Sequence, residues 1–587
     1  MKKKATTRAA EAASRQSTLN FPTSSEAELV AESTAAETTV KSQAKNRRKR
    51  TADFADTINS PAIESKAVDL ARDTLWEFPT GETLLMQLLQ IRRNSWKGRG
   101  KYKEPVAPDT SNLPTLPKGW TWASADQLTT MITDGEHITP ERAESGIFLL
   151  SARNVLDGRI CLDDVDYVPQ HEYDRIAKRL VVECGDVLLS CSGSVGRTAV
   201  VPDGLLFTLV RSVAVLKPMA KMGKYLSTAL RSPLLKQQIT EKQTQTAQAN
   251  IFQGKIKALC IPLPPLPEQH RIVAEIEKQF TRLDAGVAAL KRVQANLKRY
   301  RAAVLKAACE GKLVPTEAEL RRTADYADIA NKKMRPSASS AKSAVKTPPF
   351  ETGEQLLQRI LTKRRQNWQG RGQYKEPDAP YADNLTPLPE GWTWASVAQV
   401  SSSIVDCPHS TAKFVTVGLP CVDTTCIKPG MIVREKLRFV SRETFEQRVE
   451  RLVPAADDIV FAREGTVGTA VAIPDDVNPC LGQRVMLMRP DSCIVPRYFQ
   501  HCLNSQIIRQ QYLPKIVGST APHINVAAVK LFALPLPPLA EQTRIVAEVE
   551  RRLSVVDELE AVVSANLQRS ARLRQSILQK AFTGELV

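Results

Sequence analysis

The sequence lacks the signatures of several protein classes. It contains no GxxxxGK[ST] phosphate-binding loop, which argues against ATP hydrolysis by this chain. It contains no apolar run near the ~18 residues that cross a membrane. The N-terminal MKKKATTRAAEAASRQ is basic but lacks the apolar core of a signal peptide. These absences predict a cytoplasmic protein with no membrane association.

Cysteine and aromatic residues are both sparse. The 11 cysteines stand singly, and Cys421 and Cys426, the closest two, have no second pair or histidine cluster at zinc spacing. We therefore expect reduced thiols and no metal site. Aromatic residues make up 5% of the chain, but 42% of its residues are hydrophobic. A chain of 587 residues can therefore bury the cores of about three to four domains.

Acidic residues are outnumbered by basic ones. The formal net charge is +18 and the isoelectric point is about 9.4. A strongly basic chain most often binds a polyanion, so the charge favours nucleic acid as a partner. A charge that serves only solubility is the alternative.

What the sequence does contain is a duplication. Residues 261–314, beginning IPLPPLPEQHRIVAEI, align without gaps to 534–587, beginning LPLPPLAEQTRIVAEV, with 22 of 54 positions identical. A second pair begins FPTGETLLMQLL at Phe78 and FETGEQLLQRIL at Phe350, and both copies continue to GWTWAS. Each half of the chain therefore has a similar entrance, a divergent middle and a similar exit.

The two middles share only short pieces. GDVLLSCSGSVGRTAVVP resembles DDIVFAREGTVGTAVAIP, and TLVRSVAVLKP resembles CLGQRVMLMRP. These pieces are typical of short strands with glycine turns, so we expect the middles to share a fold and to differ in surface. The entrance and exit sequences are therefore similar in the two halves, whereas the middles have diverged.

Each Pro-rich phrase is followed by a helical pattern. Apolar residues within 272–297 and 545–567 follow mostly 3- and 4-residue steps, which predicts a helix with a narrow apolar seam. The prolines suit the helix start, and Gly311 and Gly584 suit its end. A helix over 268–310 would be about 64 Å long. We expect the two seams to pack on each other, antiparallel around a pseudo-twofold axis.

These patterns predict an α+β fold: two globular α/β domains in a tandem pseudo-repeat, separated by two long antiparallel coiled-coil-like helices. The expected parts are a disordered basic tail (1–77), a first helical lead-in (78–118), a first domain (119–262), a central long helix (263–314), a flexible linker (315–349), a second lead-in (350–390), a second domain (391–535) and a C-terminal long helix (536–587).

Catalytic motifs are not evident. We find no Ser/His/Asp or metal-hydrolase constellation. TPPF at 347–350 resembles the Asn/Asp-Pro-Pro-Tyr/Phe loop of amino-methyltransferases, but the Thr347 hydroxyl cannot replace the amide or carboxylate acceptor, so we interpret it as coincidence. DGEHIT from Asp134 and DCPHST from Asp406 form a further repeated pair. An Asp and a His three residues apart suit a metal, acid–base chemistry, a loop facing DNA or a structural turn.

The two GWTWAS domain starts, the two PLPPL-EQ-RIVAE helix starts and the two G-LV helix ends resemble the specificity subunit of Type I restriction–modification systems. The resemblance covers about 78–587, and its repeated Pro-rich phrase is a specific signal. The long N-terminal tail departs from the usual plan of that family.

The resemblance implies that each middle is a target-recognition domain, which reads one half of a bipartite, asymmetric site in double-stranded DNA. The paired helices would set the gap between the half-sites and dock two methyltransferase subunits, to which two endonuclease/translocase subunits can be added. Methyl transfer and ATP-dependent cleavage, with S-adenosylmethionine, ATP and Mg as cofactors, would belong to those partners. This chain would then be non-catalytic and would hold no cofactor.

Base readout requires Arg, Lys, Asn, Gln, Ser or Thr on exposed loops, and arginines more often position phosphates than read bases. The DNA-binding candidates of the first domain are Arg153, Asn154, Ser192, Ser194, Arg197, Gln245, Gln248 and Asn250. Those of the second domain are Thr424, Thr425, Lys428, Arg463, Thr466, Ser519, Thr520, His523 and Asn525.

Two other functions remain open at this point. The chain could be a repeat-built adaptor whose middles bind proteins without DNA specificity, in which case salt-sensitive DNA binding would be absent. It could also be a nuclease with an unrecognised site, in which case the purified chain would cleave DNA with a metal.

Overall fold

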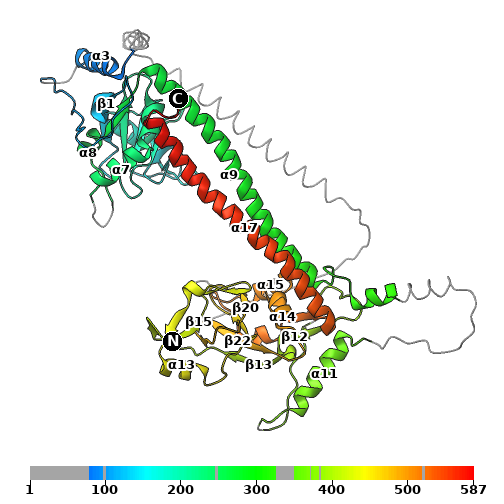
Figure 1. Cartoon of the computed structure of the whole chain (residues 1–587). Coiled ribbons are helices and arrows are strands. Elements are labelled where there is room, and N and C mark those ends of the chain that lie inside the picture. The colour runs from blue at the N-terminus through cyan, green and yellow to red at the C-terminus, as the bar shows by residue number, and fades with distance from the viewer. Residues whose placement is uncertain are drawn as a thin grey trace, which may run out of the picture. The chain divides into compact units, whose positions relative to one another are not determined.

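The computed structural model (Figure 1) describes most of the chain beyond the predicted tail. Two predicted segments lie outside the described residues: the tail (1–77) and most of the linker (325–349), which includes Thr347. The described ranges are 79–96, 101–244, 249–324, 350–370, 372–381, 385–518 and 522–587. The chain divides into two compact units, Met1–Val273 with Phe582–Gly584, and Ala274–Ala581 with Glu585–Val587.

The first unit contains one helix followed by an α+β domain and the start of a long helix. Its elements are α3 (Gly81–Asn94), β1 (Thr121–Ser124), α4 (Ala125–Leu128), β2 (Thr129–Asp134), β3 (Ile147–Leu150), β4 (Val155–Leu156), β5 (Arg159–Ile160), β6 (Asp166–Val168), α5 (Gln170–Ala177), β7 (Val187–Ser190), β8 (Thr198–Val200), β9 (Phe207–Leu209), β10 (Val213–Pro218), α6 (Gly223–Leu230), α7 (Pro233–Lys242), α8 (Gln253–Lys257), β11 (Cys260–Leu263) and α9 (Leu266–Cys309).

Two sheets form the core of this domain. The antiparallel sheet has the order β2-β10-β7-β8, and a smaller sheet has the order β6-β3-β9, in which β3 and β9 are parallel. All four residues of β7 are buried, as are Val213–Leu216 in β10. The strands are therefore covered on both faces, which accounts for their continuous apolar runs in the sequence.

The second unit repeats this arrangement with one extra strand. Its order β13-β22-β19-β20 corresponds to β2-β10-β7-β8, and β14-β18-β15-β21 corresponds to β6-β3-β9 with β14 added. The expectation that the two middles share a fold is confirmed. The elements are α11 (Gly353–Gln366), β12 (Thr393–Ser396), α12 (Val397–Val400), β13 (Ser401–Asp406), β14 (Phe414–Val415), β15 (Leu419–Val422), β16 (Ile427–Lys428), β17 (Met431–Ile432), η2 (Arg434–Lys436), β18 (Arg438–Val440), α13 (Arg442–Val449), β19 (Ile459–Ala462), β20 (Ala470–Ala472), β21 (Cys480–Leu481), β22 (Val485–Pro490), α14 (Pro496–Leu503), α15 (Gln506–Tyr512), η3 (Leu513–Lys515), α16 (Val526–Lys530), β23 (Ala533–Leu536) and α17 (Leu539–Phe582).

The repeated entrance and exit sequences pair with each other in both domains. β1 of the first GWTWAS pairs antiparallel with β11 of the first Pro-rich phrase, and β12 pairs with β23 in the same register. The glycines of the two TGE sequences lie against this ribbon. A Cβ on Gly81 would be 1.9 Å from the Leu263 oxygen, and one on Gly353 would be 2.0 Å from the Leu536 oxygen. The duplicated sequence is therefore the part that closes each domain.

The long helices begin and end close to the expected positions. α9 and α17 each span 44 residues, and α9 starts two residues earlier than expected because the first turn of a helix tolerates proline. The glutamine of each EQ pair holds the Pro-rich turn, since Gln269 donates to the Pro264 oxygen and Gln542 donates to the Pro537 oxygen. Gly311 and Gly584 follow the helix ends with φ of 66° and 78°, as a glycine stop requires.

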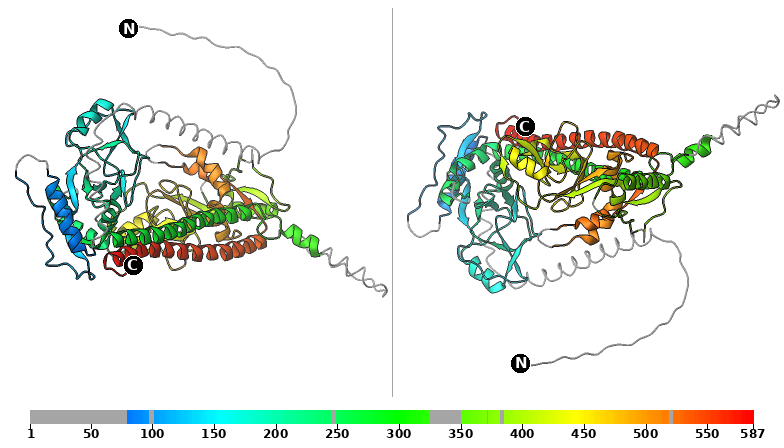
Figure 2. Two further views of the ribbon diagram at one scale, coloured as in Figure 1. Left: turned by 90° about the horizontal axis from the view of Figure 1, so that it is seen from above. Right: turned by 90° about the horizontal axis from the view of Figure 1, so that it is seen from below.

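Within the second unit, α9 and α17 run side by side and antiparallel (Figures 1 and 2). Arg301 forms an ion pair with Asp557, and Arg574 forms one with Asp284, so residue numbers rise along one helix as they fall along the other. The Arg574 guanidinium also lies 4.4 Å from the ring centre of Phe280. Along the same stretch an apolar seam is formed by Leu290, Leu297, Val556, Val563 and Leu567. The expected antiparallel packing is confirmed.

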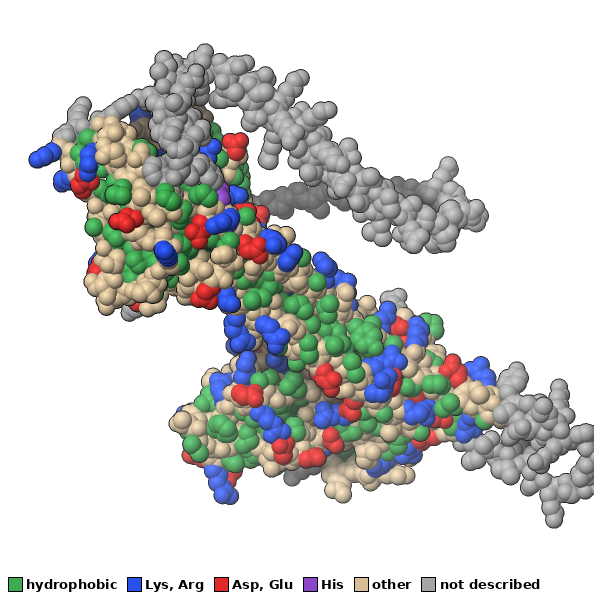
Figure 3. Space-filling model, turned by 45° about the horizontal axis from the view of Figure 1, so that its top comes forward, with side chains coloured by type: hydrophobic (Ala, Val, Ile, Leu, Met, Phe, Trp, Pro, Cys, Tyr) green, Lys and Arg blue, Asp and Glu red, His purple; other side chains and the backbone are tan. Residues whose placement is uncertain are grey.

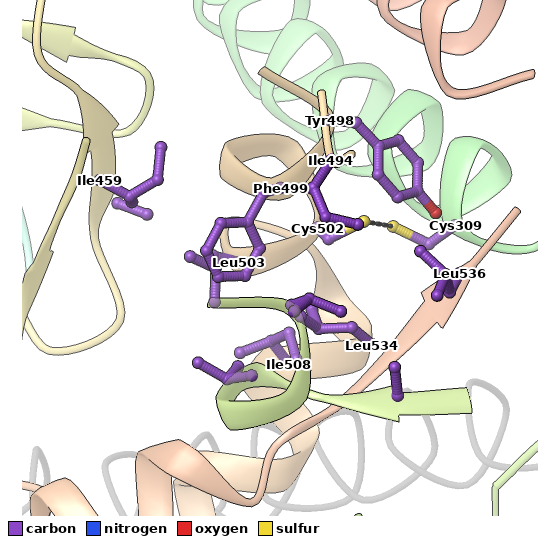
Figure 4. Close-up of a cluster of buried hydrophobic side chains, with 14 of the residues drawn as sticks. Cys309, Ile459, Ile494, Tyr498, Phe499, Cys502, Leu503, Ile508, Leu534 and Leu536 are labelled. Carbon is purple, nitrogen blue, oxygen red and sulfur yellow. Dashed lines mark hydrogen bonds between the residues drawn. The ribbon is translucent and has the colours of Figure 1, made fainter. Parts of the chain in front are cut away.

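The end of α9 is part of the hydrophobic core of the second unit. Figure 4 shows Cys309 of α9 facing Cys502 of α14, with their sulfurs 3.6 Å apart and Tyr498 alongside. Leu534 and Leu536 of β23 line the same cluster.

None of the helices that the structure describes combines the length and apolar character needed to span a bilayer.

Candidate nucleic-acid interface

The candidate residues of the first domain gather at one edge of its four-stranded sheet. β2 ends there at Asp134, β7 ends at Ser190 and β10 begins at Val213. The loop after β2 joins the start of β10, because Gly135 N–H donates to the Val213 oxygen (2.9 Å). Loops that follow adjacent strand ends lie together, so the polar side chains of these loops form one candidate binding surface.

The turn between β7 and β8 depends on two glycines and one buried hydroxyl. Gly193 and Gly196 adopt φ of 73° and 88°. The Ser190 hydroxyl donates to the Ser194 oxygen (2.6 Å) and accepts from Arg197 N–H (2.9 Å). This internal bonding fixes the turn and leaves the Ser194 side chain exposed.

A segment about 55 residues further along the chain lies against this turn. Gly193 N–H donates to the Ala249 oxygen (3.1 Å), and Ile251 N–H donates to the Cys191 oxygen (2.9 Å). Ser192 and Asn250 are bridge partners. The structure thus brings together three candidates, Ser192, Ser194 and Asn250. Gln245 and Gln248 lie outside the described residues.

The loop before β4 reaches the same edge but contributes one accessible candidate instead of two. Ala152 N–H donates to the Ser212 hydroxyl (3.1 Å), and Arg153 is exposed and pairs with Asp166 (3.0 Å). Asn154 is 2% exposed, and its amide donates to the Cys161 and Asp164 oxygens. The expectation that Asn154 contacts DNA is therefore corrected: its polar atoms hold a turn inside the domain.

The second domain forms the same edge. Gly465 and Gly468 adopt φ of 74° and 87° in the β19–β20 turn, and Thr466 between them is exposed. Ile524 N–H donates to the Arg463 oxygen (2.9 Å), which places exposed His523 beside the turn. Ser519 and Thr520 lie outside the described residues.

Arg463 and Asn525 hold this edge together. The Arg463 guanidinium donates to both carboxylate oxygens of Asp406 (3.0 and 3.1 Å) and to the Ile524 oxygen (3.2 Å). The two charged side chains are 13% and 20% exposed, so the pair is largely withdrawn from water. The Asn525 side chain accepts from Ala527 N–H and caps α16. Both side chains are already engaged in bonds that fix the loops, although Asn525 remains at the surface.

Thr424 lies next to the β19–β20 turn, and Thr425 and Lys428, the other two candidates of this segment, lie in other surroundings. A Cβ on Gly465 would be 3.8 Å from the Thr424 hydroxyl. The exposed Thr425 donates to Asp423, whose carboxylate also pairs with Arg438. Lys428 is exposed on β16, in the hairpin with β17.

The repeated Asp/His turns lie at the same two edges. The Asp134 and His137 side chains approach to 3.5 Å, and those of Asp406 and His409 approach to 3.6 Å. Arginines hold the turn backbones: Arg179 donates to the Asp134 oxygen, and Arg448 donates to the Ser410 oxygen. Among the described residues, no group of three or more His, Cys, Asp or Glu side chains could hold a metal ion. The geometry supports the structural turn.

The matched aspartates Asp134 and Asp406 lie beside different residues in the two domains. Burial, and secondarily the nearby Asp134 carboxylate, raise the pKa of the Cys191 thiol to about 12. Arg463 occupies the matching position of the second domain and neutralises Asp406. The thiol of Cys191 is therefore protonated at neutral pH and does not pair with Asp134 as Arg463 pairs with Asp406.

Residues just before β10 and β22 also belong to these edges and were missed from the sequence. Arg211 is exposed, and its N–H donates to the Glu136 oxygen (2.9 Å). Gln483 donates to the His409 oxygen (2.9 Å), and Arg484 pairs with Glu464 (3.1 Å) in a backbone with φ of 70°. The signal was available, because RSV and QRV stand within the repeated pieces, where these strands begin.

Each edge is therefore a rigid frame that presents serine, threonine, asparagine, histidine and arginine side chains on short loops. Such groups donate and accept hydrogen bonds at base edges and phosphates. The frame is the same in both domains, and the presented side chains differ at almost every matched position. The arrangement suits the recognition of two different sequences by one backbone.

Comparisons with known proteins match both domains. A family model described as the Type I restriction modification DNA specificity domain matches residues 175–294 and 421–567. The EcoBI specificity subunit of Escherichia coli is 27% identical over 327 residues, which cover 56% of this chain and 58% of that relative. The EcoKI specificity subunit of Escherichia coli strain K12 is 23% identical over 491 residues, covering 80% of this chain and 90% of that relative.

Two solved structures are also similar to this chain. The HsdS subunit from Thermoanaerobacter tengcongensis has 20% identity and a TM-score of 0.37, covering 81% of this chain and 100% of that one. A chain from a study of complex assembly and conformational transition of the type I R-M system has 19% identity and a TM-score of 0.48, covering 80% and 100%. The two matched segments are thus similar to the Type I restriction modification DNA specificity domain, and the chain is similar to specificity subunits of Type I restriction enzymes.

Proposed function

We propose that this chain is the DNA-recognition subunit of a Type I restriction–modification complex, in which each domain reads one half of a bipartite, asymmetric site. The observation that carries the proposal is the pair of matched sheet edges with different side chains. Ser192 and Asn250 lie on the first edge, where Glu464 and His523 occupy the second. Two readers with one backbone and different contacts select two different half-sites.

The paired helices set the gap between the half-sites. Each helix follows directly from the last strand of a recognition domain and runs for 44 residues, or about 66 Å. Their seam and ion pairs make the pair stiff, so the separation of the two readers is fixed by helix length.

The helices also dock two methyltransferase subunits. Apolar side chains remain exposed on the paired stretch, among them Tyr300, Val555, Leu559 and Val562. Figure 3 shows hydrophobic side chains exposed there among basic and acidic ones. An apolar surface with charged surroundings is typical of a protein–protein interface.

The reactions belong to the partners. The methyltransferase subunits carry S-adenosylmethionine and perform methyl transfer. Two endonuclease/translocase subunits that join them use ATP and Mg, and this chain contributes recognition without catalysis. The complex works in the cytoplasm, where the genome is its substrate.

Reconstitution with the methyltransferase subunit tests recognition. The complex should methylate one bipartite asymmetric sequence, whereas the chain alone with S-adenosylmethionine should transfer no methyl group. DNA binding should weaken steeply with salt, because basic side chains displace counterions from phosphates. Salt-insensitive or absent DNA binding by the complex would favour a protein-binding adaptor instead. Metal-dependent cleavage by the chain alone would favour a nuclease.

A matched insertion tests the spacing role. Four residues are inserted between Ala289 and Leu290 and four between Gln568 and Arg569, two places that face each other in the register of the ion pairs. Four residues add about 6 Å and nearly restore helical phase, so the gap should grow by about one or two base pairs. Methylation mapping should show unchanged half-sites. An unchanged gap in an active complex would contradict the proposal, and insertion in one helix alone is the control that disrupts the seam.

A further inference from the structure

The first recognition edge carries an exposed aromatic side chain that polar readout does not explain. Phe252 is 64% exposed. Among the residues within 119–262 that the structure describes, it is the one exposed aromatic side chain. A phenylalanine that is left in water loses the favourable free energy of burial, so a ring held out at a functional edge suggests a contact with a partner.

The backbone holds Phe252 rigidly beside two of the candidate contacts. Ile251 N–H is bonded to the Cys191 oxygen, and the Ile251 side chain is buried. Because side chains alternate along an extended segment, Asn250 and Phe252 point outward on either side of Ile251. The Phe252 oxygen accepts from Lys255 and Ile256 at the start of α8 (Figure 1), which anchors the residue from its other side.

The second domain lacks this feature at the matched position. Ile524 N–H bonds the Arg463 oxygen as Ile251 N–H bonds the Cys191 oxygen, so Asn525 corresponds to Phe252. Asn525 precedes α16 as Phe252 precedes α8, and its side chain caps that helix. The same backbone forms in the second domain with Asn525, so the backbone does not require an aromatic residue at this position. The Phe252 ring is therefore a surface feature of the first domain alone.

We propose that Phe252 is a specificity-determining residue that makes an apolar contact with a base of the first half-site. The inference rests on the proposed function. Two base features offer such a contact: the methyl group of a thymine, and the face of a base exposed when a side chain opens a base step. Lys255, exposed on the first turn of α8 and three residues after Phe252, offers a cation for a phosphate of the same half-site.

The test uses the full chain with its methyltransferase subunit, in three variants: Phe252→Ala, Phe252→Leu and the control Leu206→Ala. Leu206 is 51% exposed in the same domain but precedes β9, at the end opposite to the recognition edge. Affinity is measured at fixed salt for the wild-type site and for single base-pair changes at every position. Phe252→Ala should lower affinity for the intact site about tenfold and should lose discrimination at one position of the first half-site.

The other variants and the second half-site complete the test. Phe252→Leu should recover part of the affinity, and Leu206→Ala should match wild type. Discrimination in the second half-site should be unchanged in every variant, which also establishes that the complex is intact. Deoxyuridine in place of thymine identifies a methyl contact by a loss that only the wild type shows. Enhanced fluorescence of 2-aminopurine in the first half-site identifies an opened base step instead.

Each remaining outcome is decisive. Unchanged affinity and unchanged preferences in Phe252→Ala would overturn the role of Phe252 while leaving the proposed function intact. Lost discrimination confined to the second half-site would overturn it as well. A wild-type complex that selects no bipartite site would overturn the proposed function itself.

Discussion

The two recognition edges differ most in how the matched residues Cys191 and Arg463 are used. In the second domain Arg463 ties together the end of β13, the end of β19 and the segment before α16 through Asp406 and Ile524. In the first domain Cys191 accepts one backbone bond from that segment, at Ile251, its own N–H donates to the Ser212 oxygen, and its thiol donates to the Leu189 oxygen. The same backbone is therefore stabilised by an ion pair in one domain and by apolar burial in the other.

This difference shows how a duplicated domain can change its surface without losing its fold. The backbone bonds of the edge are common to both copies, so the side chain at the strand end is free to differ. A buried ion pair with additional hydrogen bonds rigidifies loops, whereas a small apolar residue at the same position forms no ion pair with the neighbouring acid. We expect the second edge to be more sensitive to changes in its side chains than the first.

Removing the arginine should have the largest effect. Arg463→Ala leaves the Asp406 carboxylate without its bidentate partner and the Ile524 oxygen without a donor, at a cost of about 3 kcal/mol. Hydrogen exchange should show faster opening of the second domain, and methylation mapping should show loss of selectivity in the second half-site alone.

A matched control separates anchoring from charge. Arg484→Ala removes an arginine from the same edge whose side chain is 54% exposed, and its pair with Glu464 should be worth less than about 1 kcal/mol. Equal destabilisation by both substitutions would contradict the anchoring role of Arg463.

Alanine at the second glycine of each turn should give an intermediate effect that again differs between the domains. Both Gly196 and Gly468 have φ near 88°, where a Cβ costs about 1–2 kcal/mol. At Gly468 the added Cβ would also lie 2.4 Å from the Tyr512 ring, whereas at Gly196 it meets only Ile239 at 3.4 Å. Gly468→Ala should therefore be the more destabilising by at least about 1 kcal/mol in domain-resolved hydrogen exchange. A larger loss at Gly196 would mean that the Tyr512 side chain moves freely.

The smallest effect concerns the thiol that stands in place of the arginine. With a pKa of about 12, on the order of one Cys191 side chain in ten thousand is a thiolate at pH 8. Iodoacetamide at pH 8 should label exposed Cys184 rapidly and leave Cys191 unmodified in the folded protein, as peptide mass spectrometry can measure. Rapid labelling of Cys191 would show that the first edge opens readily.

The sequence predicted the frame well because the frame is repeated. The antiparallel long helices, their glycine stops and the shared domain fold all follow from patterns that occur twice in the chain. Thr80 and Thr352, which cap α3 and α11, likewise stand in the TGE sequence that both copies share.

The recognition edge was harder to predict because its partners are distant in the chain. Nothing in the sequence joins Ser192 to Asn250, or Arg463 to Asp406, until the strands are placed side by side. Asn154 was misassigned because a polar residue type does not reveal burial. Arg211 and Arg484 were overlooked although they lie within repeated pieces, since a repeat draws attention to the framework rather than to the variable residues inside it.

The pairing of β1 with β11, and of β12 with β23, has a consequence for inheritance. Each recognition domain enters and leaves through neighbouring strands of one short ribbon, with Thr121 opposite Leu263 and Thr393 opposite Leu536. Everything between those strands is a cassette whose two ends meet. Crossing-over within the gene segments that encode the ribbon would exchange one whole cassette for another and leave the helices untouched. Under the proposed function, one recombination event would therefore change one recognised half-site and leave the other half-site unchanged.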